Sequence, residues 1–259
     1  MFRYFIELAY NGSNYNGWQI QPGVPSVQEE LNKALTTLLR RETDVVGAGR
    51  TDTGVNAFFF VAHFDCEEEI RDLPHLVYKL NRITGKSIAI RHLYRVTLEI
   101  HARFSAISRT YKYFIDKEKD PFTCNFSFRT FPLPDMDRMN EACRILFEYE
   151  DFTSFSKLHT DTKTNFCKIM QAEWVDTGTQ LVFTIQANRF LRNMVRAIVG
   201  TMLDIGQGKI SPEELRNIIA SKDRCCAGSS VPGNALFLWD IQYPEEVRQF
   251  KYPTRNETH

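Results

Sequence analysis

Apolar and polar positions alternate over residues 3–10, and this alternation predicts a strand. Tyr4, Ile6 and Leu8 fall on one face, whereas Arg3 and Glu7 fall on the other. A period of two with one apolar face is typical of a half-buried strand. Similar short runs predict further strands at residues 44–46, 57–64, 88–96, 110–115, 168–176, 181–187 and 236–241.

Other segments repeat apolar residues every three or four positions, which predicts helices. One opens with the capping box Ser26-Val27-Gln28-Glu29 and ends near Arg40 and Arg41. The most apolar helix begins near Leu191 and ends at Gly206, a residue that favours helix ends. Further helices are predicted at residues 72–81, at residues 137–147 and after a cap at residues 211–214.

Strands and helices are mixed in both halves of the chain without strict alternation. This arrangement favours an α+β fold over a doubly wound parallel sheet. Residues 110–115 weakly echo the first strand, which indicates two related lobes. We place these lobes at residues 1–103 and 104–259.

Composition narrows the function classes. The 259 residues include 43% hydrophobic and 25% charged residues, as in an ordinary soluble protein. The longest apolar run, residues 57–62, is far shorter than the roughly 20 residues of a membrane span. We therefore expect a cytoplasmic protein without a membrane partner. The six cysteines contain no Cys-x-x-Cys pair and the histidines lack ligand spacing, so we expect no metal and free thiols.

The net charge is zero, which taken alone argues against binding to nucleic acid. The distribution of charge differs from the total. Nine basic residues and two acidic ones lie between residues 76 and 117. Arg189, Arg192 and Arg196 follow without an intervening acid. A neutral chain can thus carry a basic face, although chance segregation on a solvated surface explains the same pattern.

The strongest candidate for chemistry is Asp52, in Gly49-Arg50-Thr51-Asp52-Thr53-Gly54 just before the apolar run. Glycines permit close approach of a ligand, and a carboxylate beside an arginine can stay ionised and act as a nucleophile. An ordinary turn is the commoner role of an isolated Asp-x-Gly. Asp52-Thr53-Gly54 is also the triplet of aspartic proteases. Those enzymes need two carboxylates that share a proton, and the triplet recurs at Asp176-Thr177-Gly178. The lead-in to Asp52 is polar, however, and the neighbouring Arg50 disfavours a shared proton.

Other residues suggest contacts with nucleic acid. Tyr111 follows Arg109 in a basic strand, and an aromatic ring beside cations suits base stacking, although a buried strand tyrosine fits equally well. Arg192 and Arg196 are four residues apart at the predicted start of the apolar helix, which would place them on one helical face.

Five stretches in one order and spacing resemble the bacterial tRNA pseudouridine synthase A family. They are residues 10–21 with Tyr10-Asn11-Gly12 and Gly17-Trp18-Gln19-Ile20-Gln21, residues 49–55, residues 109–113 with Arg109-Thr110-Tyr111-Lys112-Tyr113, residues 151–155, and residues 188–196. The resemblance spans about residues 4–243.

The resemblance implies two lobes, each a mostly antiparallel sheet with helices on one face, flanking a basic cleft. It implies a homodimer that binds tRNA and isomerises uridines 38, 39 and 40 of the anticodon stem-loop to pseudouridine. No cofactor or metal is implied. Such chemistry breaks the N1–C1′ bond, turns the uracil and rejoins it through C5, so no atom is lost.

The resemblance also implies roles for single residues. Asp52 falls on the catalytic aspartate and Tyr111 on the tyrosine that packs against the target base. Arg196 falls on the arginine that pairs with the carboxylate, and Arg50 on the arginine that enters the RNA helix as the base flips. We assign Arg109, Lys112, Arg189 and Arg192 to the RNA backbone.

Two stretches depart from the family pattern. Asn56 stands where the family usually has His, and residues 225–232 are looser than the usual Ala-Gly-x-Thr-Ala-Pro, so the far wall of the pocket is expected to differ. The sequence leaves open whether Asp52 attacks the sugar, attacks the ring or removes a sugar proton. A non-catalytic tRNA-binding or chaperone protein is the alternative function.

Overall fold

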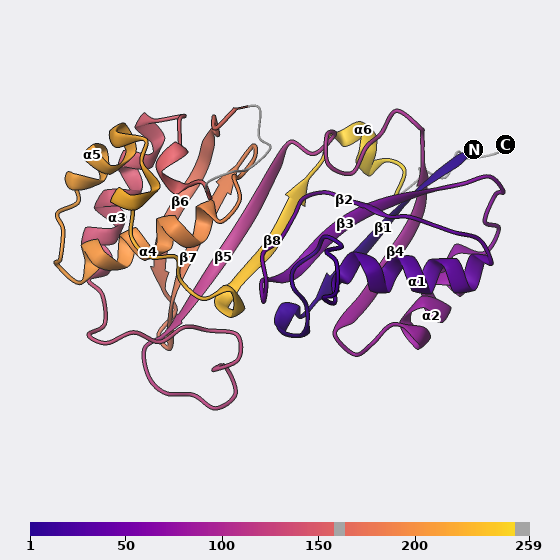
Figure 1. Ribbon diagram of the computed structural model, residues 1–259, viewed down its shortest axis with the longest axis horizontal. Coiled ribbons are helices and arrows are strands. Elements are labelled where there is room, and N and C mark those ends of the chain that lie inside the picture. Colours follow the sequence, from indigo (N-terminus) through magenta and orange to yellow (C-terminus); the bar gives the residue numbers. More distant parts are fainter. Residues whose placement is uncertain (158–163, 252–259) are drawn as a thin grey trace, which may run out of the picture. The chain divides into compact units, whose positions relative to one another are not determined.

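The computed structural model describes residues 1–157 and 164–251, and the chain forms two compact units (Figure 1). The first unit comprises Met1–Thr53, Ala57–Ile107 and the chain from Asp240 onward. The second comprises Gly54–Asn56 and Ser108–Trp239. The lobes at residues 1–103 and 104–259 stay a prediction about domains. Strands and helices are mixed in both units, and the fold class is α+β.

The first unit is built on an antiparallel sheet in the order β4–β1–β3, with the short β2 paired to β3. Its strands are β1 (Phe2–Tyr10), β2 (Val46–Gly47), β3 (Asn56–Cys66) and β4 (Ile88–Val96). Central β1 is buried on both faces. Glu7 lies on the face predicted to be polar, yet it is only 4% exposed. Its carboxylate accepts hydrogen bonds from the Tyr94 hydroxyl at 3.2 Å and from Lys251 Nζ at 2.7 Å. The alternation predicts a strand that is buried on one face only, and this prediction is wrong for the face that carries Glu7.

Two helices complete the first unit, and Figure 1 shows them together beside these strands. They are α1 (Val27–Leu39) and α2 (Leu73–Ile83), with the short α6 (Glu245–Arg248) near the C-terminus. The Ser26 hydroxyl caps α1 by accepting from the Glu29 N–H at 3.3 Å, as the capping box predicts. Arg40, in the left-handed region with φ 54°, ends the helix.

The second unit is built on the strand order β8–β5–β7–β6, in which the pairs β5–β7 and β7–β6 are antiparallel. Its strands are β5 (Ser108–Asp116), β6 (Ile169–Asp176), β7 (Gln180–Ala187) and β8 (Leu236–Gln242). Its helices are α3 (Met136–Ile145), α4 (Met194–Gly206) and α5 (Glu214–Ser221). Residues 236–239 of β8 belong to this unit, and its last three residues belong to the first.

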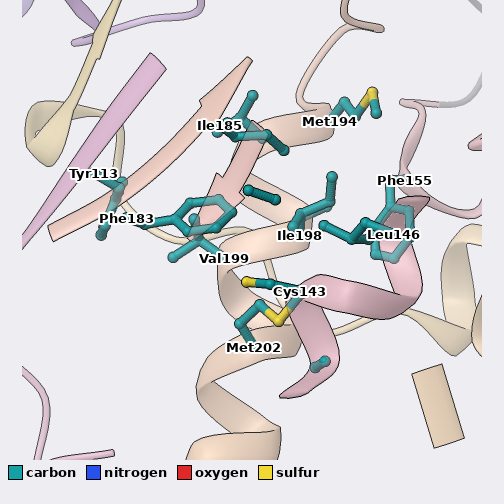
Figure 2. Packing of buried hydrophobic residues seen from close by; sticks show 14 of the residues in the cluster. Tyr113, Cys143, Leu146, Phe155, Phe183, Ile185, Met194, Ile198, Val199 and Met202 are labelled. Atoms are coloured by element: carbon teal, nitrogen blue, oxygen red, sulfur yellow. The ribbon is translucent and has the colours of Figure 1, made fainter. Parts of the chain in front are cut away.

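The core of the second unit lies between its sheet and α4. Figure 2 shows Tyr113 and Phe183 from the sheet packed close to Ile198, Val199 and Met202 from the helix. These side chains are fully buried, and each buried large apolar side chain stabilises a fold by about 1.5–3 kcal/mol. This packing fixes α4 against β5, the two elements that carry the site residues of this unit.

Helix α4 begins at Met194, three residues after the position predicted from its apolar pattern. Asn193 precedes it in the left-handed region, with φ 66°. A helix does not continue through such a residue. None of the helices in the described part of the chain combines the length and the apolar character that a membrane span requires. All six cysteines are free thiols, three of them buried and three exposed.

Candidate active site

The loop that carries Asp52 connects β2 to β3 in the first unit, and the body of that unit anchors it. The Ala48 N–H donates to the Val61 carbonyl at 2.8 Å as the loop begins. The Thr51 carbonyl accepts from the Trp18 N–H at 3.3 Å, and the Thr51 hydroxyl lies 2.9 Å from the Tyr10 hydroxyl. Residue 51 is therefore held through its backbone and its side chain, directly before the aspartate.

Gly17 lies directly against this anchored peptide. Its φ of +92° favours glycine, and a Cβ atom here would overlap the Thr51 carbonyl oxygen and lie 3.1 Å from the Asp52 carbonyl carbon. Gly47 has a related role, because its Cβ would lie 2.5 Å from the Trp18 ring. The indole instead packs on Phe60, with ring centroids 4.2 Å apart. Two glycines and a buried tryptophan thus set the position of the loop.

Within this loop the charged side chains reach solvent. Asp52 is partly exposed, whereas Arg50 and Thr53 are exposed. Gly54 follows with φ +75°, which turns the backbone into β3. The structure thus places a solvent-accessible carboxylate on a rigid support, beside an arginine of the same loop.

The end of the loop groups with the second unit. Val55 belongs to the hydrophobic core of that unit. Asn56 is 1% exposed, and its Nδ2 donates to the Asn234 carbonyl at 2.7 Å. The residue that departs from the family pattern is thus a buried structural donor in this chain.

In the second unit, Tyr111 and Arg109 share one face of β5, because strand side chains alternate and the β5–β7 register is continuous. The Tyr111 ring packs edge-on against Phe190, with centroids 5.1 Å apart and planes at 87°. Arg109 Nη1 donates to the Asn188 carbonyl at 3.0 Å. Phe190, which the sequence pattern does not single out, therefore supports the stacking candidate.

Arg196 lies in the first turn of α4, and its Nε donates to the Val231 carbonyl at 2.7 Å. Burial raises the pKa of Tyr113 well above its usual range, and the positive charge of Arg196 acts in the opposite direction. The Tyr113 hydroxyl donates to the next carbonyl, that of Pro232, at 3.2 Å, so Arg196 and Tyr113 bind adjacent peptide groups. Tyr113 points to the same side of β5 as Tyr111, so the structure brings Tyr111 and Arg196 to one side of the second unit.

The remaining basic candidates are distributed differently. Arg189 Nη1 donates to the Thr164 hydroxyl at 3.2 Å. Arg192 is exposed and precedes α4, so the helical face that the sequence assigned to Arg192 and Arg196 is wrong. The left-handed Asn193 lies between them and breaks the helical spacing. Lys112 alternates to the opposite face of β5 from Tyr111, where its Nζ lies 4.4 Å from the Trp239 ring centroid.

The candidates thus form two groups. Asp52 and Arg50 belong to the first unit, and Tyr111, Arg109 and Arg196 belong to the second. Their meeting at one uridine stays a prediction. Within the described residues there is no cluster of three or more His, Cys, Asp or Glu side chains suited to a metal ion.

Comparisons with known proteins agree on one family. A sequence model described as tRNA pseudouridine synthase matches residues 142–244. The protein named tRNA pseudouridine synthase A of Parabacteroides distasonis is 56% identical over 95% of this chain and 98% of its own length. The relative of the same name from Bacteroides fragilis is 56% identical over the same shares. That of Bacillus subtilis is 38% identical over 91% of this chain and 97% of its own. The chain belongs to the tRNA pseudouridine synthase A family.

Proposed function

We propose that this protein isomerises uridines 38, 39 and 40 of the tRNA anticodon stem-loop to pseudouridine, with Asp52 as the catalytic carboxylate. The observation that carries the proposal is the rigidly anchored, partly exposed Asp52 in a chain that is 56% identical to proteins named tRNA pseudouridine synthase A. Such a carboxylate fits a reaction that needs one acidic group and releases no atom.

The reaction divides into steps that residues of this chain can serve. The target base must leave its stem, which costs a few kcal/mol in unstacking and unpairing. The N1–C1′ bond then breaks, the uracil turns, and C5 bonds to C1′ in place of N1. The proton on C5 is finally lost to a base, and N1 gains one. Nothing in this balance requires a redox partner or a second substrate.

We assign the roles as follows. Asp52 acts on the nucleotide as nucleophile or base, and Arg196 pairs with that carboxylate. Tyr111 receives the extruded uracil on its ring, supported by Phe190 at 5.1 Å. Arg50, exposed in the same loop as Asp52, enters the space that the base leaves. Binding of the flipped base by these side chains offsets the cost of unstacking.

The RNA backbone is expected to meet the basic residues of the second unit. We assign phosphate contacts to Arg109, Arg189 and Arg192, and Lys112 stays a candidate on the other face of β5. We further propose that the protein works as a cytoplasmic homodimer without a cofactor, as the family resemblance implies.

The test compares Asp52→Asn with a matched control, Glu67→Gln, which changes an exposed carboxylate of the same unit in the same way. Asp52→Asn is expected to keep the thermal unfolding midpoint and the tRNA affinity but to lose pseudouridine formation on an unmodified transcript. Glu67→Gln is expected to behave as wild type. Substantial turnover by Asp52→Asn would contradict the proposal, and tRNA binding without turnover by wild type would favour the tRNA chaperone instead.

A further inference from the structure

The backbone of residues 228–231, here called the 228–231 segment, lies against α4 in the second unit. At one end, the Gly228 N–H donates to the Thr201 hydroxyl at 2.9 Å. At the other end, the Val231 N–H donates to the Arg196 carbonyl at 3.3 Å. The segment is thus fixed to the helix at two places, and the second of them is the arginine assigned to the catalytic carboxylate.

Two glycines allow this close approach. A Cβ atom on Gly200 would overlap the Ser229 carbonyl oxygen, and a Cβ atom on Gly228 would lie 2.9 Å from the Gly200 carbonyl carbon. Both obstacles are backbone atoms, so a side chain at either position displaces the segment from the helix. Gly200 is therefore more than a small core residue, because its lack of a side chain sets the distance between α4 and the segment.

Ser230 provides a second anchor. Its hydroxyl oxygen accepts from Asn193 Nδ2 at 2.6 Å and from Arg224 Nη2 at 2.9 Å. Asn193 is the left-handed residue directly before α4. The hydroxyl of Ser230 therefore links the 228–231 segment to the start of the helix that carries Arg196.

The carbonyl groups at the end of the segment orient side chains from two elements. The Val231 carbonyl accepts from Arg196 Nε at 2.7 Å, and the next carbonyl, of Pro232, accepts from the Tyr113 hydroxyl at 3.2 Å. An arginine side chain has many rotamers, so a fixed contact is needed to hold its guanidinium in one orientation. A bond at Nε fixes the plane of the guanidinium, and this plane decides how the terminal nitrogens meet a carboxylate.

We propose that the 228–231 segment is a positioning device for Arg196, and that Ser230 and Gly200 are positioning residues of the isomerisation. This inference rests on the proposed function, because it assigns a source of orientation to the arginine that pairs with Asp52. Neither residue touches the substrate in this account. Both act by keeping the Val231 carbonyl where it holds the guanidinium.

Kinetics provide the first test, with Ser230→Ala and Ser211→Ala compared on tRNA transcript. Ser211 is the matched control, because its hydroxyl accepts from the Glu214 N–H at 3.3 Å at the start of α5 and it lies outside both α4 and the 228–231 segment. Displacement of a positioning group by about 1 Å costs about 100-fold in rate, so a partial shift is expected to lower kcat about 10-fold. KM is expected to change less than about 3-fold, and Ser211→Ala to match wild type. A wild-type kcat for Ser230→Ala would overturn the inference.

A double-mutant cycle separates positioning from a general structural effect. Ser230→Ala is measured under single-turnover conditions in the wild-type background and in an Arg196→Lys background. Lysine lacks a guanidinium group and its Nε–H, so the Val231 carbonyl can no longer orient the side chain at position 196. The loss caused by Ser230→Ala is expected to disappear in that background. Equal losses in both backgrounds would overturn the inference.

A spectroscopic measurement does not depend on activity. The Nε–H resonance of Arg196, assigned by its absence in Arg196→Lys, is expected to exchange slowly in wild type and faster in Ser230→Ala and Gly200→Ala. Gly206→Ala is the matched control, since it adds the same crowded methyl group at the other end of α4, 2.7 Å from Pro134 Cβ. Unchanged exchange in Ser230→Ala would overturn the inference. Absence of wild-type turnover with this exchange pattern intact would refute only the proposed function.

Discussion

The position of the Asp52 carboxylate depends on how the peptide before it is held. The carboxylate itself is partly exposed, so its precision comes from its neighbours. The Thr51 carbonyl accepts a hydrogen bond from the Trp18 N–H, and the Thr51 hydroxyl lies beside the Tyr10 hydroxyl. Gly17 has no side chain and so leaves the space that this peptide occupies. A catalytic group needs placement to within a fraction of an ångström, and buried backbone contacts supply it.

Gly17→Ala tests this support. The added methyl group would overlap the Thr51 carbonyl oxygen at a φ of +92°, so the Asp52 loop must shift. We expect a loss of about 1–3 kcal/mol in the free energy of unfolding and a fall in kcat of about 100-fold. Chemical denaturation and pseudouridine formation measure the two effects.

Gly23→Ala is the matched control, because Gly23 also has a positive φ of +75° but no atom within 4 Å of the added Cβ. It carries the backbone strain without the contact with the loop. Its kcat is expected to stay within about 2-fold of wild type. If both variants lose kcat equally, contact with Thr51 does not position Asp52.

Strand β3 carries a buried base that plays no part in the proposed chemistry. His63 is 3% exposed, and its Nδ1 accepts from the Ala102 N–H at 3.2 Å. Burial lowers the pKa of His63 to about 4, and the positive charges of Arg3 and His101 add to this effect while Asp65 opposes it. The ring is therefore neutral in the folded strand at neutral pH.

A pH dependence of stability follows. The unfolded chain protonates His63 near its ordinary pKa of 6.5, whereas the folded chain does so only at about 4. Its contribution to stability is therefore complete above pH 6.5 and is lost as the pH falls towards 4. Asparagine keeps an acceptor in place of Nδ1 but does not titrate. We expect the unfolding midpoint of His63→Asn to fall less than that of wild type between pH 7 and pH 4.5. An equal fall in both proteins would contradict this.

The sequence predicts most elements well, because their apolar period is local. The strand predicted at residues 88–96 is β4, with the same limits. The helix predicted at residues 72–81 is α2, which begins one residue later, after the N-cap Asp72, and ends two residues later. A local pattern does not predict which residue adopts a left-handed backbone conformation, or which residues distant in the sequence come into contact. The left-handed Asn193 delays α4, and Lys251, remote in sequence, pairs with Glu7 and buries the face predicted to be polar.

The same division applies to the site. The glycine-bounded Asp52 and the aromatic beside Arg109 are visible in the sequence, because residue type carries their chemistry. The residues that position them are not visible. The Val231 carbonyl accepts a hydrogen bond from Arg196, which is 35 positions away in the sequence. The Phe190 ring contacts the Tyr111 ring only after the chain folds. Residues 225–232, set apart as a departure from the family pattern, prove to contain the segment that contacts Arg196.

The proposed chemistry draws on both units of one chain. The chain leaves the first unit directly after Thr53 and returns to it at Ala57, and the second unit supplies Tyr111 and Arg196. The sequence also spreads positive charge unevenly, with nine basic residues between residues 76 and 117 in a chain of zero net charge. Because the net charge of the chain is zero, we expect the affinity for tRNA to depend on a few well-placed basic side chains.

Single variants of Arg109 and Lys112 identify which face of β5 the RNA follows. Each phosphate contact contributes about one to the slope of log affinity against log salt. If tRNA follows the face that carries Tyr111, Arg109→Gln weakens binding and reduces this slope, and Lys112→Gln changes neither. Filter binding over a salt series measures both quantities. A larger effect of Lys112→Gln would place the RNA on the face that carries Trp239.

We propose that Asp52 isomerises uridines in one region of tRNA. Position-resolved mapping of pseudouridine, in an unmodified tRNA transcript with uridines at 38, 39 and 40, tests it most directly. With wild-type protein, pseudouridine is expected at these positions and not at the other uridines, and with Asp52→Asn at none. Pseudouridine at other positions, or equal modification by both proteins, would contradict the account.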